Sequence, residues 1–141
     1  MNMERIDSQI SGMSGEFLTV GKLFKRGIQA SLTLGNAKSI DILAYNPRSG
    51  KNFNIQVKSL RKKNCFPIKR EAIISEHIYV FIILNKPEEN EDYYIIKGSE
   101  ILSDLNKFFG SCYSGEKVSP KPAINYGPLK EYKDNWQIFE S

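Results

Sequence analysis

Residues 53–59 read Phe-Asn-Ile-Gln-Val-Lys-Ser. Apolar and polar side chains alternate strictly along this stretch, which is the period-two pattern of a half-buried β-strand. Gln56 and Lys58 stand on its polar face. A solvated strand face would explain both residues without any function, so the neighbouring segments decide what they are for.

The segment before this strand, residues 39–50, reads as another strand followed by the turn sequence Pro-Arg-Ser-Gly. The two strands should therefore form a hairpin, and a four-residue loop places Asp41 directly opposite Gln56. Directly opposed residues share a sheet face with their Cβ atoms about 4.5–5.5 Å apart. Asp41, Gln56 and Lys58 then form one polar cluster, unless a β-bulge shifts the register.

Periodicity predicts the other elements of the chain. We expect a helix over residues 14–25 that ends at Gly27, strands over residues 28–34, 78–84 and 93–96, a short helix over 99–109, a loop over 110–128, and a tail that packs through Trp136 and Phe139. Residues 78–84 are apolar throughout, as in a central strand covered on both faces. The sequence predicts an α/β fold with a mixed central β-sheet flanked by helices, in one domain over residues 1–141 with its core at about 12–109 and a C-terminal loop and tail at 110–141.

The predicted first helix carries both an apolar face and an acidic residue. Met13, Phe17, Val20 and Phe24 are spaced by four, three and four residues and line one side of it. Glu16 lies roughly 70° from the centre of that side, at about 100° per residue. It can reach over the sheet edge towards the polar cluster. Alternatively, a carboxylate in the first turn of a helix is there because it interacts favourably with the helix dipole.

Charge and composition limit the classes of function. The 141 residues carry a net charge of +4, which is compatible with a polyanionic partner. Residues 58–70 hold six positive charges and no acid, at Lys58, Arg61, Lys62, Lys63, Lys69 and Arg70. Such a segment suits contacts with a phosphate backbone, or it is a solvated loop. No run approaches the roughly 20 apolar residues of a membrane helix, and the N-terminus lacks the apolar core of a signal peptide, so we expect a cytoplasmic protein without membrane contact.

The polar cluster is suited to metal-assisted chemistry. The Asp41 carboxylate and the Gln56 side-chain oxygen are hard ligands of the kind that Mg²⁺ prefers. The Lys58 ammonium can position or deprotonate an attacking water and stabilise charge on a phosphorane. His77, the one histidine of the sequence, precedes the apolar strand and is expected to have a role at the strand end rather than in catalysis.

Three motifs in this order resemble the PD-(D/E)XK nuclease superfamily: Gly-Glu at 15–16, Gly-Asn-Ala-Lys-Ser-Ile-Asp-Ile-Leu-Ala-Tyr-Asn at 35–46, and Ile-Gln-Val-Lys-Ser at 55–59. The resemblance covers roughly residues 12–97. It implies a restriction endonuclease-like α-β-β-β-α-β core and hydrolysis of phosphodiester bonds, with DNA as the expected substrate. It also implies that Glu16, Asp41 and Gln56 bind Mg²⁺ or Mn²⁺ while Lys58 assists the attack. Small nucleases of this fold often act as dimers, which suggests a homodimer.

Two features depart from the superfamily pattern. Most members have a carboxylate where this chain has Gln56, and the helix between the third and fourth strands is reduced to at most a short turn near residues 70–75. The alternative function is a nuclease fold with weak or no catalysis that binds nucleic acid or a protein partner. An unrelated α/β domain with a structural role is the third reading.

Overall fold

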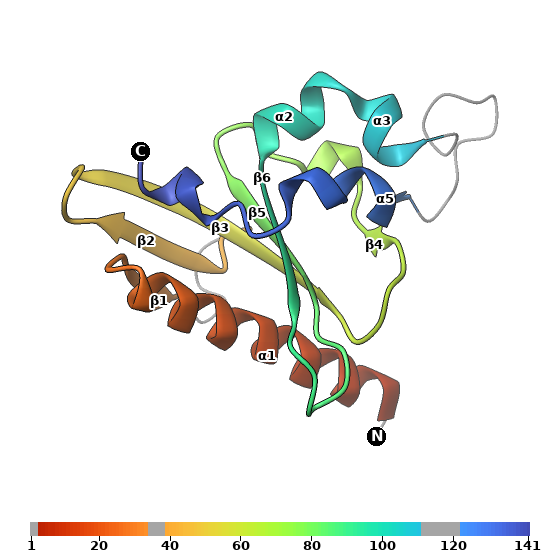
Figure 1. Ribbon diagram of the computed structural model, residues 1–141. Coiled ribbons are helices and arrows are strands. Elements are labelled where there is room, and N and C mark those ends of the chain that lie inside the picture. Colours follow the sequence, from red (N-terminus) through yellow and green to blue (C-terminus); the bar gives the residue numbers. More distant parts are fainter. Residues whose placement is uncertain (1–2, 34–38, 111–121) are drawn as a thin grey trace.

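The computed structural model describes residues 3–33, 39–110 and 122–141 and shows a five-stranded mixed sheet in the order β1-β2-β3-β5-β6 (Figure 1). The strands are β1 Gln29–Leu32, β2 Ile42–Asn46, β3 Lys51–Leu60, β5 Ile78–Ile83 and β6 Asp92–Lys97, with a separate two-stranded sheet of β4 Phe66–Pro67 and β7 Ala123–Ile124. The helical elements are α1 Met3–Lys25, α2 Gly98–Ser103, α3 Leu105–Phe109, α5 Tyr126–Leu129 and the 3-10 helices η1 Arg70–Ala72, η2 Lys130–Tyr132 and η3 Trp136–Phe139.

The predicted hairpin is confirmed. β2 and β3 are antiparallel, from Asn46 opposite Lys51 to Ile42 opposite Ile55. The four-residue turn between them closes where the Gly50 N–H donates to the Asn46 carbonyl at 2.8 Å. Gly50 has a φ of +75°, a conformation that glycine adopts without steric cost.

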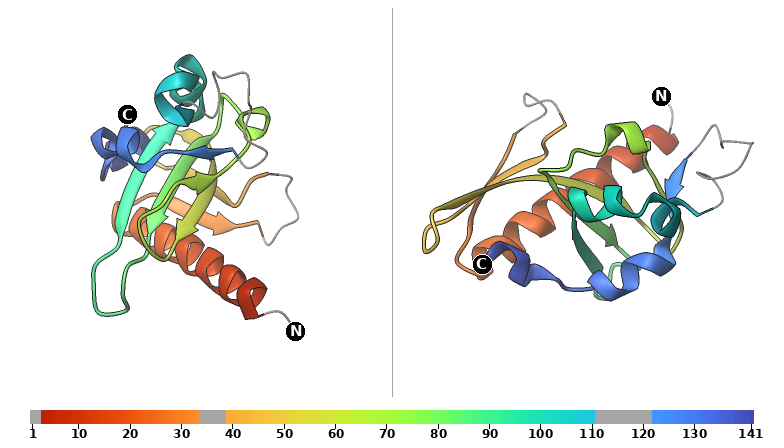
Figure 2. Two further views of the ribbon diagram at one scale, coloured as in Figure 1. Left: turned by 90° about the vertical axis from the view of Figure 1, so that its right-hand side faces the viewer. Right: turned by 90° about the horizontal axis from the view of Figure 1, so that it is seen from above.

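β5 is an interior strand of the sheet and is covered on both faces, as its apolar sequence predicts. It runs parallel to β3 and antiparallel to β6, and all its residues are buried. Alternate β5 side chains enter two cores on opposite faces of the sheet: Val80 packs with residues of α1 and the C-terminal tail, and Phe81 packs with residues of α2, α3 and α5. Figure 2 shows helices on both sides of the sheet. Trp136 and Phe139 of the tail are buried, as expected.

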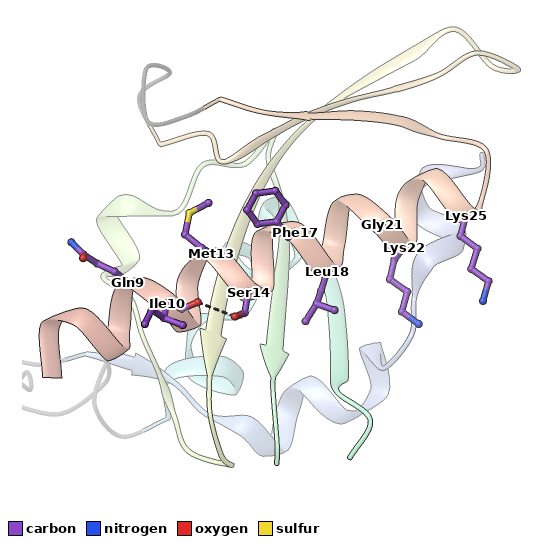
Figure 3. A pocket seen from close by; sticks show the side chains of 9 residues that line it. All are labelled: Gln9, Ile10, Met13, Ser14, Phe17, Leu18, Gly21, Lys22 and Lys25. Atoms are coloured by element: carbon purple, nitrogen blue, oxygen red, sulfur yellow. Dashed lines mark hydrogen bonds between the residues drawn. The ribbon is translucent and has the colours of Figure 1, made fainter. Parts of the chain in front are cut away.

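Helix α1 differs from its prediction at its start and in its packing. It begins at Met3, well before residue 14, and ends at Lys25 as predicted; Gly27, in the turn just beyond, has a φ of +78°. Its buried side consists of Ser11, Gly15, Thr19 and Leu23. The larger apolar residues face solvent instead: Ile10 is 53 %, Met13 39 %, Phe17 61 % and Phe24 55 % exposed. Figure 3 shows several of these side chains projecting from the helix.

Three more predictions need correction or completion. The short helix of residues 99–109 is divided at Asp104, whose φ of −148° is not helical and whose carboxylate accepts the Lys107 N–H at 3.2 Å. Within the predicted loop 110–128, β7 pairs with β4 and α5 follows it. The segment between β3 and β5 holds β4 and η1 and no α-helix, consistent with the reduced turn expected there. Gly35-Asn36, a dipeptide that predicts a turn, lies outside the described residues. None of the described helices has the length and apolar character of a membrane span.

Candidate active site

Asp41 lies where β2 separates from β3. Its backbone N–H donates to the carbonyl of Ile55 at 2.9 Å, although Ile55 is already paired with Ile42. This is a β-bulge, so the predicted direct pairing of Asp41 with Gln56 is wrong by one residue. The bulge turns the side chain across the gap, where Oδ2 accepts the backbone N–H of Val57 at 2.7 Å.

The bond to Val57 places the carboxylate beside the predicted motif, because Val57 stands between Gln56 and Lys58. It satisfies a backbone donor of β3 at the point where β2 no longer pairs with it. It engages one carboxylate oxygen, and no hydrogen bond from the described residues reaches Oδ1, so that this oxygen can bind a ligand. The predicted grouping of Asp41 with the β3 motif is therefore present, although a bulge produces it rather than a regular register.

Glu16 approaches from α1. The helix can lie directly on β3 because its residue 15 is glycine: a Cβ there would be 1.8 Å from Ser59 Oγ and 3.3 Å from Ile82 Cδ1. This close contact sets the neighbouring Glu16 at the sheet. Burial, and secondly the negative charge of Asp41, raise the pKa of the Glu16 carboxyl. Two carboxylates that repel each other in this way form a favourable place for a cation.

Gln56 is buried rather than solvated, with 6 % of its surface exposed. It lies beside Tyr79 of β5 in the parallel pairing of the two strands. Its Nε2 atom is 3.0 Å from His77 Nδ1 and 3.0 Å from the Tyr79 hydroxyl. The amide is thus hydrogen-bonded to Tyr79 in β5 and to His77, the residue just before β5, which the sequence did not predict.

Lys58 follows two residues later on the same face of β3 and is partly exposed. Its neighbour on β5 is Phe81. Glu16 therefore comes from the α1 side of the sheet, Gln56 and Lys58 from the opposite side, and Asp41 from the edge between them.

The predicted basic residues separate into three places. Arg61 forms an ion pair with Asp7 of α1, with 2.7 Å between Nη2 and Oδ1. Lys62 is exposed, and Lys63 lies over the ring of Tyr126 at 5.5 Å. Exposed Lys69 and Arg70 lie at η1, which packs on Tyr79: the Tyr79 hydroxyl contacts the Ala72 carbonyl at 3.4 Å. Arg70 also pairs with Glu71 at 3.0 Å.

The site combines two carboxylates, an amide and a lysine. Within residues 3–33, 39–110 and 122–141, no three His, Cys, Asp or Glu side chains group as metal ligands. The oxygen atoms that could bind a metal belong to the carboxylates of Glu16 and Asp41, which are close enough to repel each other. The Gln56 amide supplies the third oxygen. Hard oxygen donors with a neighbouring ammonium suit a hydrated divalent cation and a phosphate.

Comparisons with known proteins identify the fold. No protein-family model and no curated protein sequence matches the chain. Among solved structures it resembles the bacterial homing endonuclease I-Ssp6803I, with a TM-score of 0.62 and 18 % identity over 94 % of this chain and 91 % of that one. It also aligns with Hjc, a Holliday junction resolvase from Archaeoglobus fulgidus, with a TM-score of 0.49 and 14 % identity over 82 % and 88 % of the two chains.

The chain therefore has the restriction endonuclease-like fold that its motifs predict. The sequence-based prediction omitted Gly15, His77 and Tyr79 from the site. The only polar atoms that residues 78–84 carry on their side chains belong to Tyr79, and a hydroxyl in an otherwise apolar central strand was the signal that a buried polar partner exists.

Proposed function

We propose that this chain hydrolyses phosphodiester bonds of nucleic acid, with DNA as its substrate. One observation carries the proposal: the Asp41 carboxylate bonds to the β3 backbone between Gln56 and Lys58 at 2.7 Å. Glu16 is close enough for Asp41 to contribute to its raised pKa. The restriction endonuclease-like fold supports the same reading.

Asp41, Gln56 and Glu16 would hold a Mg²⁺ or Mn²⁺ ion through oxygen atoms. When bound, such an ion supplies Lewis acidity to the scissile phosphate and to the attacking water. Asp41 would bind the ion through Oδ1, since the bond from Val57 engages Oδ2. Lys58 orients or deprotonates the attacking water, and its ammonium stabilises the charge that develops on the phosphoryl oxygens.

The phosphate backbone would bind to the exposed lysines that follow the site. Lys62, Lys63 and Lys69 are exposed, and each phosphate contact contributes about 0.9 to the slope of log affinity against log salt on duplex DNA. We expect the variant with all three replaced by alanine to lose about 2 to 3 from that slope. Arg61 and Arg70 extend the same basic segment, each with an acidic neighbour.

We infer that two copies associate through the exposed apolar side of α1. Ile10, Phe17 and Phe24 recur every seven residues and are all more than half exposed, which is the spacing of a helix-pairing seam. In an antiparallel pair centred on Phe17, Ile10 meets Phe24 of the other copy. Met13 then meets Gly21, around which no atom lies within 4 Å of an added Cβ. A seam that matches itself when reversed suits a two-fold dimer. Phe17→Ser should produce a monomer in sedimentation equilibrium, and an unchanged mass would contradict this assembly.

The cleavage proposal is tested on supercoiled plasmid and on a four-way DNA junction, with Mg²⁺ or Mn²⁺ and with chelator. Lys58→Ala is compared with Lys51→Ala, a matched control because Lys51 is an exposed lysine at the other end of β3. We expect metal-dependent nicking that Lys58→Ala abolishes and Lys51→Ala preserves.

Three other outcomes separate the alternatives. DNA binding without nicking in either metal would replace the enzyme by a nucleic-acid-binding nuclease fold, for which the amide at position 56 is the structural reason. The absence of both DNA binding and nicking would refute both nucleic-acid functions. Nicking that survives Lys58→Ala would refute the proposed site.

A further inference from the structure

Gln56 has its amide hydrogen-bonded on one side only. Both hydrogen-bond partners, His77 and Tyr79, contact the nitrogen Nε2. Among the described residues, no donor reaches the oxygen Oε1. An amide nitrogen carries two hydrogens, so two bonds use its donors completely and leave the carbonyl oxygen for another ligand.

The Tyr79 hydroxyl decides which end of the amide faces β5. It accepts the backbone N–H of Ile74 at 2.8 Å and directs its one hydrogen to the Ala72 carbonyl at 3.4 Å. With that hydrogen in use, the hydroxyl can only accept from Gln56, so the amide must present an N–H to it. The orientation of the amide thus follows from directing the Tyr79 hydrogen to the Ala72 carbonyl.

The same count determines the tautomer of His77. Since Gln56 donates its second N–H to Nδ1, this nitrogen must lack a hydrogen, and the ring hydrogen is on Nε2. His77 is 7 % exposed and Tyr79 is fully buried.

We propose that His77 and Tyr79 are positioning residues that hold the Gln56 amide with its nitrogen towards β5 and its carbonyl oxygen towards the candidate metal site. The role goes beyond the motif, and it rests on the proposed function because it presupposes a cation near Asp41. It also gives a reason for an amide at position 56. A carboxylate there would meet a hydroxyl whose hydrogen is engaged and a ring nitrogen without one, whereas glutamine supplies both hydrogens.

The tautomer can be measured directly, because His77 is the single histidine of the chain. A long-range ¹H–¹⁵N correlation spectrum of the metal-free, ¹⁵N-labelled protein near pH 8, about 1.5 units above the usual histidine pKa, contains the ring nitrogens of this residue alone. We expect an unprotonated Nδ1 and a protonated Nε2, and in Gln56→Leu a changed Nδ1 resonance. A hydrogen on Nδ1 in the unchanged protein would overturn the proposal, since Gln56 would then present its carbonyl to the ring and its NH₂ group to the site.

Metal binding measured by Mn²⁺ calorimetry gives the second readout. Mutation of a residue that hydrogen-bonds to a metal ligand typically lowers metal affinity by about 10- to 100-fold. We therefore expect Tyr79→Phe and His77→Leu to weaken Mn²⁺ binding by about tenfold or more. His77→Asn keeps an acceptor near the position of Nδ1 and should restore most of the affinity. In the Gln56→Ala background, Tyr79→Phe should have no further effect. An equal effect in both backgrounds would show that Tyr79 acts only on the fold and would overturn the proposal.

These readouts distinguish the two levels of inference. If the unchanged protein binds no Mn²⁺, the proposed metal-dependent function fails, and the inference that Gln56 serves a metal fails with it, even where the spectrum shows the expected tautomer. If Mn²⁺ binds and DNA is nicked while Nδ1 carries the hydrogen, the proposed function stands and the positioning role alone is refuted.

Discussion

Replacing Gly15 with alanine tests whether close contact between α1 and β3 positions the site. The added Cβ would lie 1.8 Å from Ser59 Oγ, 3.1 Å from Ser59 Cβ and 3.3 Å from Ile82 Cδ1. Rotation of the serine relieves the first contact only. Overpacking of this kind costs about 1–3 kcal/mol, while alanine gains about 0.5–1 kcal/mol over glycine inside a helix. We therefore expect a net loss of about 1–2 kcal/mol in the free energy of unfolding.

Gly12→Ala is the matched control, because no atom lies within 4 Å of a Cβ at that position of the same helix. It should stabilise the protein by about 0.5–1 kcal/mol. Both variants are measured by urea unfolding followed by far-UV circular dichroism, with the midpoint compared at constant m-value. A stability for Gly15→Ala equal to that of Gly12→Ala would refute the close-contact argument.

The contact also predicts a rescue and a functional consequence. Ser59 Oγ is buried and has no hydrogen-bond partner among the described residues, so Ser59→Ala alone should leave stability unchanged or raise it. Combined with Gly15→Ala, it should recover part of the lost stability, since the contact with Cβ remains. Gly15→Ala should also weaken Mn²⁺ binding, because relief of the clash moves α1 and the adjacent Glu16 away from Asp41, whereas Gly12→Ala should leave binding intact.

Three further predictions follow from individual contacts. The folded state raises the pKa of the Glu16 carboxyl above 4.5, so the folded protein binds this proton more tightly than the unfolded chain, and the metal-free protein loses stability as the pH rises through the raised value. Glu16→Gln should therefore melt at a higher temperature than the unchanged protein at pH 7 and lose this advantage towards pH 4. A difference in melting temperature that does not depend on pH would contradict the raised pKa. Asp41→Ala should cost about 1–3 kcal/mol more than Asp41→Asn in urea unfolding, because only asparagine retains an acceptor for the Val57 N–H, while both abolish metal-dependent nicking. Asn46→Ala should lower the free energy of unfolding by about 1–3 kcal/mol, since the buried side chain donates to the Phe139 carbonyl at 2.8 Å and accepts the Arg48 N–H at 2.9 Å. A loss within 0.5 kcal/mol, about the effect of an ordinary surface substitution, would show that the tail does not depend on this bond.

Several features could be predicted from the sequence because the information is local. The alternation in residues 53–59 identifies β3, and the four-residue turn determines which residues of β2 it faces. The unbroken apolar run of residues 78–84 identifies a strand with two covered faces. Together with Glu16, these segments contain the order of motifs that predicts the restriction endonuclease-like fold.

Three decisive features depend on contacts between segments distant in the sequence. Hydrophobic spacing shows that α1 has an apolar side, but most of that side faces solvent, and the helix approaches Ser59 through Gly15, where there is no room for a Cβ. The bulge at Asp41 arises where β2 separates from β3, which no local pattern encodes. The partners of Gln56 come from the parallel pairing of β3 with β5. Periodicity in a sequence reports which side chains share a face, whereas the surface that covers this face, and the donors that orient a buried amide, exist only once the chain has folded.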